Sequence, residues 1–387
     1  MRYRTFGRLD WRPSALGFGA MRLPIVGDDP AQIDEPVATQ LLHYAINHGV
    51  NYVDTAYPYH GGTSEVFLGR ALQGGYRERI RLATKLPCWL VKEPADFDRY
   101  LDEQLARLQT PRVDFYLLHG LNAGRWQAMR DLGVLAWAER AMADGRIGYL
   151  GFSFHDKFEV FREIVDAYDG WTFCQIQYNF MDEHRQAGVQ GLKYAAAKGL
   201  AVVVMEPLRG GLLAGNVGQR PGGGLPPSVQ ALWDSAPRRR SPAEWALQWL
   251  WNQPEVSVVL SGMSTLAQVQ ENIASADRSG PGTLTPEELE LIARVRDEYY
   301  RLCPIPCTGC NYCQPCPNGV NIPGIFNIYN EAIMFNAAEY GRRTYTLWIS
   351  AEARADRCLQ CGECETKCPQ EIAIIEWLEK IDRFMTA

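Results

Sequence analysis

The stretch Gly17-Phe18-Gly19-Ala20-Met21-Arg22 closes the first apolar run of the chain and decides between two fold classes. An open doubly wound sheet that binds a dinucleotide needs a phosphate-binding G-x-G-x-x-G after its first strand. Here the two glycines continue into Ala20-Met21-Arg22, so the fingerprint fails. The alternation of strands and helices must therefore be explained by another α/β architecture.

Short apolar runs alternate with amphipathic helical patterns through the first three-quarters of the chain. The predicted strands end near Phe18, Asp54, Lys85, His119, Ser153, Gln177, Pro207 and Gly262. Helical patterns between them include Val37–Asn47, Phe97–Leu108, Leu135–Met142 and Gln190–Ala197. Eight such units at this spacing predict a closed (β/α)8 TIM barrel.

Helix signals place the end of the barrel near residue 300. Ser241-Pro242-Ala243-Glu244 and Thr285-Pro286-Glu287-Glu288 are capping boxes with proline at the first helical position. The last barrel helix should run from about Pro286 to Arg301, before Cys303-Pro304-Ile305-Pro306 breaks it. We expect a barrel over residues 1–300 and a small, largely helical domain over residues 301–387.

Eight cysteines of that second domain fall into two blocks with iron–sulfur spacing. The first block reads C-x2-C-x2-C-x2-C-P and the second C-x2-C-x2-C-x3-C-P. In two-cluster ferredoxins the fourth cysteine of a block ligates the other cluster. This rule predicts two [4Fe–4S] clusters, one held by Cys307, Cys310, Cys313 and Cys368, and the other by Cys358, Cys361, Cys364 and Cys316.

Two other interpretations of the cysteines are weaker. Zinc sites use pairs of C-x2-C rather than triplets, and disulfide scaffolds are typical of short secreted chains. Cys303 lies just upstream of the first block, where it is either a spare ligand or a plain thiol. Cys88 and Cys174 lie in apolar runs, as small core residues do.

Composition bounds the function classes. The chain has 387 residues, 47% of them hydrophobic, with a mean hydropathy of −0.24, which describes a globule with a sizeable core. Its net charge of −6 argues against a general nucleic-acid binder. No segment has the length of a membrane span or the apolar region of a signal peptide, so we expect a cytoplasmic protein without a membrane partner.

Polar residues follow three consecutive predicted strands. Asp54 begins the run Asp54-Thr55-Ala56-Tyr57-Pro58-Tyr59, Lys85 ends the third strand, and His119 ends the fourth. Consecutive strand ends are neighbours around the mouth of a barrel. In these residues, in the run Gly61-Gly62-Thr63-Ser64-Glu65 and in the segment Val256–Asn272, the sequence resembles the aldo-keto reductases. With its tail, the whole chain resembles the branch that carries a C-terminal 4Fe–4S ferredoxin-like domain.

The resemblance implies a catalytic tetrad of Asp54, Tyr59, Lys85 and His119. Tyr59 would give a proton to the carbonyl oxygen while a nicotinamide gives hydride to the carbon. Lys85 would lower the pKa of Tyr59, and Asp54 would keep Lys85 charged. His119 would orient the carbonyl by a hydrogen bond. Tyr57 is the competing tyrosine, but Tyr59 matches the family spacing.

The resemblance also implies an extended NAD(P)H across the barrel mouth. The positions that match its binding residues are Gly19, Ala20, Met21, Ser153, Gln175, Met205, Pro207, Leu208, Arg209, Gly211, Leu213, Ser261, Gly262, Met263, Ser264, Gln268, Glu271 and Asn272. Phe154 replaces the usual amide after Ser153, and Met205 replaces an aromatic residue. Gly262 and Gln268 stand where Lys or Arg would hold a 2′-phosphate, which leaves NADH and NADPH both open.

The substrate pocket and the redox partners are less defined by the sequence. His60, Trp89 and Asn122 follow tetrad residues and are candidates for the pocket wall. A nicotinamide gives two electrons as hydride whereas each cluster accepts one, and no sequence feature identifies a flavin to couple them. We expect a carbonyl–alcohol oxidoreductase acting on a small molecule, whose clusters serve electron transfer with a ferredoxin-like partner. The alternatives are structural or oxygen-sensing clusters, or a redox-sensing nucleotide-binding module with little turnover.

Overall fold

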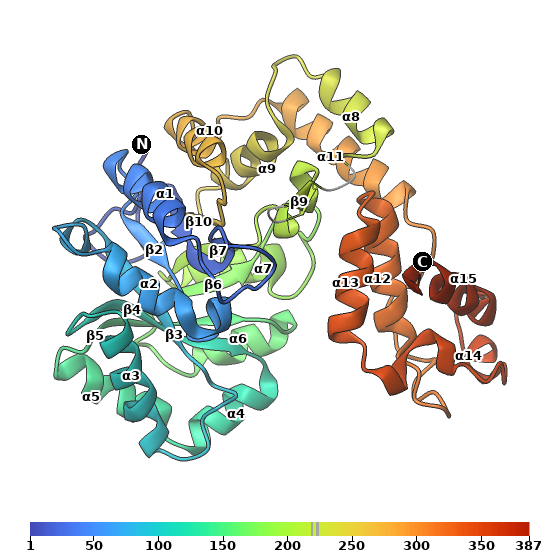
Figure 1. Ribbon diagram of the computed structural model, residues 1–387, viewed down its shortest axis with the longest axis horizontal. Helices are drawn as coiled ribbons and strands as arrows, with labels where there is room; N and C mark the ends of the chain where they lie inside the picture. Colours follow the sequence, from blue (N-terminus) through green and yellow to red (C-terminus); the bar gives the residue numbers. More distant parts are fainter. Residues whose placement is uncertain (218–219, 222–223, 387) are drawn as a thin grey trace. The chain divides into compact units, whose positions relative to one another are not determined.

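Eight parallel strands close into a barrel in the order β1-β10-β7-β6-β5-β4-β3-β2 (Figure 1). The computed structural model describes residues 1–217, 220–221 and 224–386. The barrel strands are β1 (Leu16–Gly19), β2 (Tyr52–Asp54), β3 (Arg81–Leu86), β4 (Val113–Leu121), β5 (Ile147–Phe154), β6 (Phe173–Gln177), β7 (Ala201–Met205) and β10 (Val256–Ser261). The predicted (β/α)8 barrel is therefore confirmed, and each predicted strand end lies within two residues of the observed one.

Helices surround the barrel and continue into the C-terminal region. Those of the barrel are α1 (Glu35–Asn47), α2 (Thr63–Ala71), α3 (Ala95–Arg107), α4 (Ala123–Asp131), α5 (Val134–Ala143), α6 (Phe158–Asp166), α7 (Gly188–Ala197), α9 (Pro242–Trp251) and α10 (Leu266–Asp277). The others are α8 (Pro227–Asp234), α11 (Pro286–Arg301), α12 (Ile322–Met334), α13 (Ala338–Trp348), α14 (Glu363–Thr366) and α15 (Ile374–Thr386). Both capping boxes begin a helix as predicted, at Pro242 and Pro286.

Shorter elements complete the chain. The 3-10 turns are η1 (Ala20–Arg22), η2 (Tyr59–Gly62), η3 (Arg77–Arg79), η4 (Arg209–Ala214), η5 (Ala351–Ala353) and η6 (Ala355–Arg357). A small hairpin pairs β8 (Asn216–Val217) with β9 (Arg220–Pro221). The seventh barrel strand ends two residues before the predicted Pro207, because Glu206 turns the backbone into the left-handed region with φ 53°.

The barrel interior is packed by side chains from the strands and from the N-terminal segment. Phe6 lies at its base, with its ring centroid 4.9 Å from that of Phe115 and 5.6 Å from that of Phe173. Gly17 is required in β1 because a Cβ there would lie 2.7 Å from the Leu260 side chain. The filled lower barrel leaves the carboxyl ends of the strands as the place for polar groups.

The described chain divides into two compact units. The first comprises residues 1–209 and 244–285, and the second residues 210–243 and 286–387. Within the second unit, α12 packs on α13 and both contact α15, around a core that includes Ile325, Phe326 and Leu378. The helical content of the C-terminal region agrees with the prediction, whereas the domain boundary at residue 300 stays a prediction.

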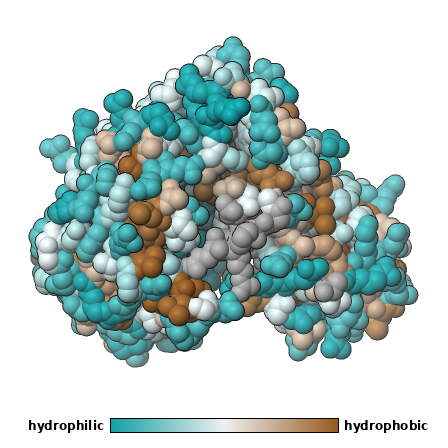
Figure 2. All heavy atoms as spheres, turned by 45° about the horizontal axis from the view of Figure 1, so that its top comes forward, coloured by the Kyte–Doolittle hydropathy of each residue, from teal (hydrophilic) through white to brown (hydrophobic). Residues whose placement is uncertain are grey.

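Hydrophilic residues cover most of the face shown in Figure 2, with apolar residues in smaller patches. Among the described residues, no helix combines the length and the apolar character that a membrane crossing requires.

Candidate active site and cluster sites

Three of the four predicted catalytic residues form one connected group at the carboxyl ends of β2 and β3. The Lys85 Nζ donates hydrogen bonds to Asp54 Oδ1 at 2.6 Å, to the Thr55 carbonyl oxygen at 2.7 Å and to Tyr59 Oη at 3.3 Å. The register explains their approach, because Asp54 pairs with Ala83 and Lys85 lies two residues further along β3. Thr55, which the sequence reasoning did not single out, takes part through its backbone carbonyl alone, so no side-chain pattern could have revealed it.

His119 lies near this group on the adjacent strand β4, with its ring centroid 6.2 Å from that of Tyr59 and the two planes at 82°. Its Nδ1 is buried and has no hydrogen-bond partner among the residues that the structure describes. Burial, with further contributions from Lys85 and nearby cationic side chains, holds the pKa of His119 well below 6.5. The imidazole is therefore neutral at pH 7 and can donate or accept a hydrogen bond.

Burial dominates the protonation of the other three groups. It raises the pKa of Asp54, against the opposing effect of Lys85. Burial alone would lower the pKa of Lys85, but Asp54 and Tyr59 outweigh it and the pKa is raised. Burial also raises the pKa of Tyr59 above 10, and Lys85 offsets only part of this. Lys85 thus acts on Tyr59 in the expected direction without producing the net lowering that we expected.

A buried polar network supports the strand that carries Lys85. Gln104 on α3 donates to the Lys85 carbonyl at 3.1 Å and to Glu65 Oε1 at 2.6 Å, and Thr84 Oγ1 also donates to Glu65 Oε1 at 2.6 Å. Glu65 is fully buried and pairs with Arg107 at 3.2 Å. Each polar group in the network has a partner, which holds β3 in one position.

Tyr57 points away from this group. Its hydroxyl donates to the carboxylate of Glu103 at 3.3 Å, and the guanidinium carbon of Arg107 lies 4.2 Å from its ring centroid. The two tyrosines on the same short loop therefore face different surroundings, and only Tyr59 contacts Lys85.

The three predicted pocket residues have different surroundings. His60 is buried with φ 54°, its Nδ1 donates to the Pro30 carbonyl at 2.7 Å, and its Nε2 accepts from Leu23 N at 3.1 Å. Both ring nitrogens are therefore committed to the backbone. Asn122 Oδ1 caps α4 by accepting from Arg125 N at 2.9 Å. Trp89 is 39% exposed, and its ring centroid lies 5.0 Å from that of His119.

Several predicted cofactor positions lie on neighbouring strand ends of the barrel. Ser153 and Gln175 are directly paired between β5 and β6. Ser153 Oγ accepts from Gly120 N at 2.7 Å, and the buried Gln175 Oε1 has no partner among the described residues. A carboxamide N–H would satisfy this oxygen, so the pair fits the amide end of a nicotinamide. Met205 lies beside it, with its sulfur 3.7 Å from Gln175 Nε2.

The segment after β10 forms the start of α10. Ser264 N donates to Gln268 Oε1 at 2.8 Å, and Asn272 Nδ2 donates to Ser261 Oγ at 3.1 Å. Glu271 is exposed, Gly262 is close to the Arg22 side chain, and Met263 is buried. The Gln268 side-chain oxygen is thus hydrogen-bonded to the backbone at the start of its own helix.

The remaining predicted cofactor positions belong to the first strand end and the loop after β7. Gly19 lies against Ser261, Ala20 is buried, and Met21 is 58% exposed. Pro207 is buried, Leu208 is partly buried, and Arg209 pairs with Asp182 at 3.1 Å. The last two predicted cofactor positions belong to the second compact unit: they are Gly211, which has φ 103°, and Leu213, which is buried.

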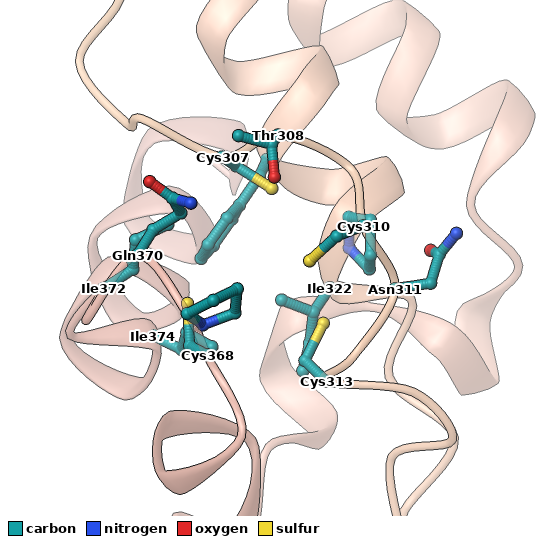
Figure 3. A pocket seen from close by; sticks show the side chains of 13 residues that line it. Cys307, Thr308, Cys310, Asn311, Cys313, Ile322, Cys368, Gln370, Ile372 and Ile374 are labelled. Carbon is teal, nitrogen blue, oxygen red and sulfur yellow. The ribbon is translucent and has the colours of Figure 1, made fainter.

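The eight block cysteines lie around two cavities of the second unit. The first is lined by Cys307, Cys310, Cys313 and Cys368 (Figure 3). The second is lined by Cys316, Cys358, Cys361 and Cys364. These are the two sets that the ferredoxin rule predicts, each with the fourth cysteine of the other block.

The donor sets suit clusters rather than single ions. Burial, together with the neighbouring thiols of Cys307, Cys310 and Cys368, raises the pKa of Cys313. Within the described part of the chain, no three Cys, His or carboxylate groups are close enough to share one metal ion. Four thiols around an apolar cavity instead fit an iron–sulfur cube. Cys303 lines neither cavity, and its sulfur faces the Ile305 carbonyl at 3.4 Å.

A parallel eight-stranded barrel with an Asp–Lys–Tyr group and a histidine at its carboxyl edge is the arrangement of a barrel oxidoreductase. The model of the aldo/keto reductase family matches residues 15–296, and the chain belongs to this family. A 4Fe–4S dicluster domain matches residues 306–373. The family uses a nicotinamide cofactor, and the second match indicates 4Fe–4S clusters.

Relatives of known structure or name cover mainly the barrel. The aldo-keto reductase AKR11C1 from Bacillus halodurans (holo form) is 29% identical, with a TM-score of 0.61 over 76% of this chain and 96% of its own. The L-galactose dehydrogenase of Arabidopsis thaliana is 29% identical over 70% of this chain and 87% of its own length. Aflatoxin B1 aldehyde reductase member 2 of Rattus norvegicus is 26% identical over 70% and 83%.

Proposed function

We propose that the protein is an NAD(P)-dependent oxidoreductase that interconverts a carbonyl and an alcohol, and that it carries two [4Fe–4S] clusters for electron transfer. The observation that supports the reaction is the contact of Lys85 with both Asp54 and Tyr59 beside His119, at the strand ends of a barrel. The named aldehyde reductase and dehydrogenase relatives agree with this reaction class.

The chain's own groups handle the proton and the oxygen of the substrate. A bound nicotinamide supplies the hydride for reduction and accepts it for oxidation. Tyr59 donates its hydroxyl proton to the oxygen of the carbonyl as the carbon–oxygen double bond becomes single, so that a neutral alcohol leaves. Lys85 stabilises the tyrosinate that remains, with Asp54 as its counter-ion at 2.6 Å. The neutral His119 hydrogen-bonds the same substrate oxygen, and Tyr59 regains its proton from solvent.

The eight cysteines would hold the clusters, four at each cavity. Ile322 lines both cavities, so the two clusters would be separated by little more than one side chain. That proximity favours passage of single electrons between them, and a small ferredoxin-like protein is the partner class that we propose for the exchange. Among the described residues, the barrel has no group that would split a hydride pair by itself.

Isotope transfer tests the barrel reaction directly. The full-length protein, purified without oxygen and with its clusters intact, should be mixed with nicotinamide that carries deuterium at C4 and a panel of aldehydes. We expect deuterium on the alcohol carbon of the product with one or both of NADH and NADPH. Reduction that places no deuterium there would refute direct hydride transfer.

A second measurement separates electron transfer from the other roles of the clusters. Reduction of the clusters bleaches their broad visible absorbance, so the absorbance should be followed during anaerobic addition of NADH or NADPH, with and without a ferredoxin. Bleaching that depends on nicotinamide or ferredoxin supports electron transfer. Unchanged absorbance under every condition, with full carbonyl reduction, would leave the clusters a structural or sensing role. Oxidation of a single equivalent of nicotinamide without cycling would instead favour the redox-sensing module.

A further inference from the structure

An arginine that the tetrad does not use lies at the mouth of the barrel. Arg125 is in the first turn of α4, directly after β4, and its Nη1 donates to the Gly120 carbonyl at 2.6 Å. Gly120 follows His119 and has φ 65°. A Cβ on Gly120 would lie 3.1 Å from Arg125 Nη1. Because glycine has no side chain, the guanidinium has room beside Gly120.

Trp89 links Arg125 to the site. Its ring lies 5.0 Å from His119, at an interplanar angle of 62°. The guanidinium carbon of Arg125 lies 5.8 Å from the same ring, on the distance scale of a cation–π contact. His119, Trp89 and Arg125 therefore form one continuous wall, from the group proposed to bind the carbonyl oxygen to a fixed positive charge.

In the part of the chain that the structure describes, this positive charge has no counter-ion. No carboxylate of the described residues lies within ion-pair distance of Arg125, whose only side-chain hydrogen bond there is the one to Gly120. The nearby Asp156 accepts instead from the backbone N–H groups of Ala123 and Lys157. Glu206 follows the last residue of β7. Burial lowers the pKa of His155 and raises that of Tyr59, and the negative charge of Glu206 contributes in the raising direction to both.

The position is also unfavourable for a cation that only supports the fold. The first turn of a helix carries the positive end of the helix dipole, where anions are stabilised and cations are not. Arg125 is half-buried there, and its remaining N–H groups can form a planar pair of donors. A planar anion, and a carboxylate in particular, matches such a fork.

We infer that Arg125 is a carboxylate-binding residue and that the substrate of this site is an oxo acid, a molecule with a reducible carbonyl at one end and a carboxylate at the other. Trp89 packs against the flat or short apolar body that joins the two groups. This inference rests on the proposed carbonyl chemistry, since it names the substrate class of the same site. A phosphate fits less well, because it carries a second negative charge and this wall offers Arg125 as its one cation.

A matched pair of probes tests it in the full-length, cluster-loaded protein. 4-Carboxybenzaldehyde and 4-formylbenzamide have the same planar body and differ in the charge of one end. We expect Arg125→Gln to lower kcat/KM for the carboxylate probe about 30-fold, mainly through KM, while the amide probe changes less than threefold. A 30-fold loss corresponds to about 2 kcal/mol. Arg125→Lys should recover part of the loss.

Arg130→Gln is the control, because Arg130 lies on the same helix with its side chain 39% exposed and near Glu163. It should leave both probes unchanged. Equal losses on both probes in Arg125→Gln would show that Arg125 only supports the Gly120 backbone, which overturns the inference. A wild-type preference for 4-formylphenyl phosphate over the carboxylate probe would also overturn it.

Calorimetric binding of the carboxylate probe separates this inference from the proposed reaction. Binding to the wild type that is lost in Arg125→Gln, without any turnover, would sustain the carboxylate site while the proposed function fails. Turnover of the amide probe as efficient as that of the carboxylate probe, with no carboxylate binding preference, would sustain the reaction and overturn the carboxylate site.

Discussion

Replacing Tyr59 by phenylalanine removes one oxygen atom from the barrel mouth and should abolish most carbonyl reduction. The hydroxyl contacts Lys85 Nζ at 3.3 Å, and the ring centroid of Tyr59 lies 6.2 Å from that of His119. A hydroxyl that supplies the proton in the transition state cannot be replaced by the hydrogen of a phenyl ring.

The size of the effect follows from the role of the hydroxyl. A positioned general acid contributes a factor of roughly 10² to 10⁴ in rate, or about 3–5 kcal/mol of activation free energy. The cost to the fold should be far smaller. Tyr59 Oη has a single hydrogen bond among the described residues, so its loss should lower the free energy of unfolding by about 1 kcal/mol.

Tyr57→Phe provides a matched control. Tyr57 is two residues away, and its hydroxyl also makes long hydrogen bonds, to Glu103 at 3.3 Å, but on the side of α3. Initial rates of aldehyde reduction should be compared for both variants, together with their thermal unfolding. We expect a loss of at least about 100-fold in Tyr59→Phe and less than about threefold in Tyr57→Phe.

The pH dependence gives a second signature. Burial raises the pKa of Tyr59, so the proton donor stays protonated through neutral pH and reduction should be flat between about pH 6 and 9. Oxidation of an alcohol needs the tyrosinate and should instead rise about tenfold per pH unit and still be rising at about pH 10, because the pKa of Tyr59 is raised. Full reduction activity in Tyr59→Phe, or an oxidation rate that falls as the pH rises, would refute the assignment.

Three further predictions concern stability and the clusters. Lys85→Met leaves Asp54 buried without its cation and should cost about 3–5 kcal/mol of unfolding free energy at pH 7. Burial raises the folded-state pKa of this carboxyl, so the loss should be smallest below about pH 4 and grow as the pH rises through that pKa; a loss independent of pH would contradict the burial argument. Cys368→Ser should lose the cluster at the cavity of Figure 3, so metal analysis should find about four iron atoms per chain. Cys303→Ser should keep both clusters and about eight iron atoms. Equal iron loss in the two variants would count against the assignment. Gly69→Ala should destabilise the barrel by about 1–3 kcal/mol in chemical denaturation, because its Cβ would lie 2.3 Å from a carbonyl oxygen at the end of α3; a stabilised variant would show that helix propensity outweighs the clash.

The barrel and its main candidate residues could be predicted from the sequence because they depend on local patterns. Strand and helix periodicities repeat along the chain, and the carboxyl ends of consecutive parallel strands must meet at one mouth. Asp54, Lys85 and His119 are strand-end residues of this kind. The cysteine spacing likewise predicts the two sets of four, because ligands two residues apart can turn toward one cluster.

Side-chain direction was beyond the sequence because it depends on the local backbone and on neighbours from other elements. The left-handed φ of His60 turns its ring into backbone hydrogen bonds, although its position after Tyr59 predicts a pocket residue. Tyr57 and Tyr59 differ by two positions, yet α3 supplies a carboxylate to one and β3 an ammonium to the other.

The fold class, the family resemblance and the residue types of both candidate sites follow from the amino-acid sequence, because periodicity and spacing carry them. Three features emerge only from the folded molecule: α8 packs on α11, burial outweighs Lys85 in the pKa of Tyr59, and Arg125 lies beside the site with no counter-ion among the described residues. The physical reason is that burial and charge pairing depend on contacts between segments far apart in the chain, and no local pattern records them.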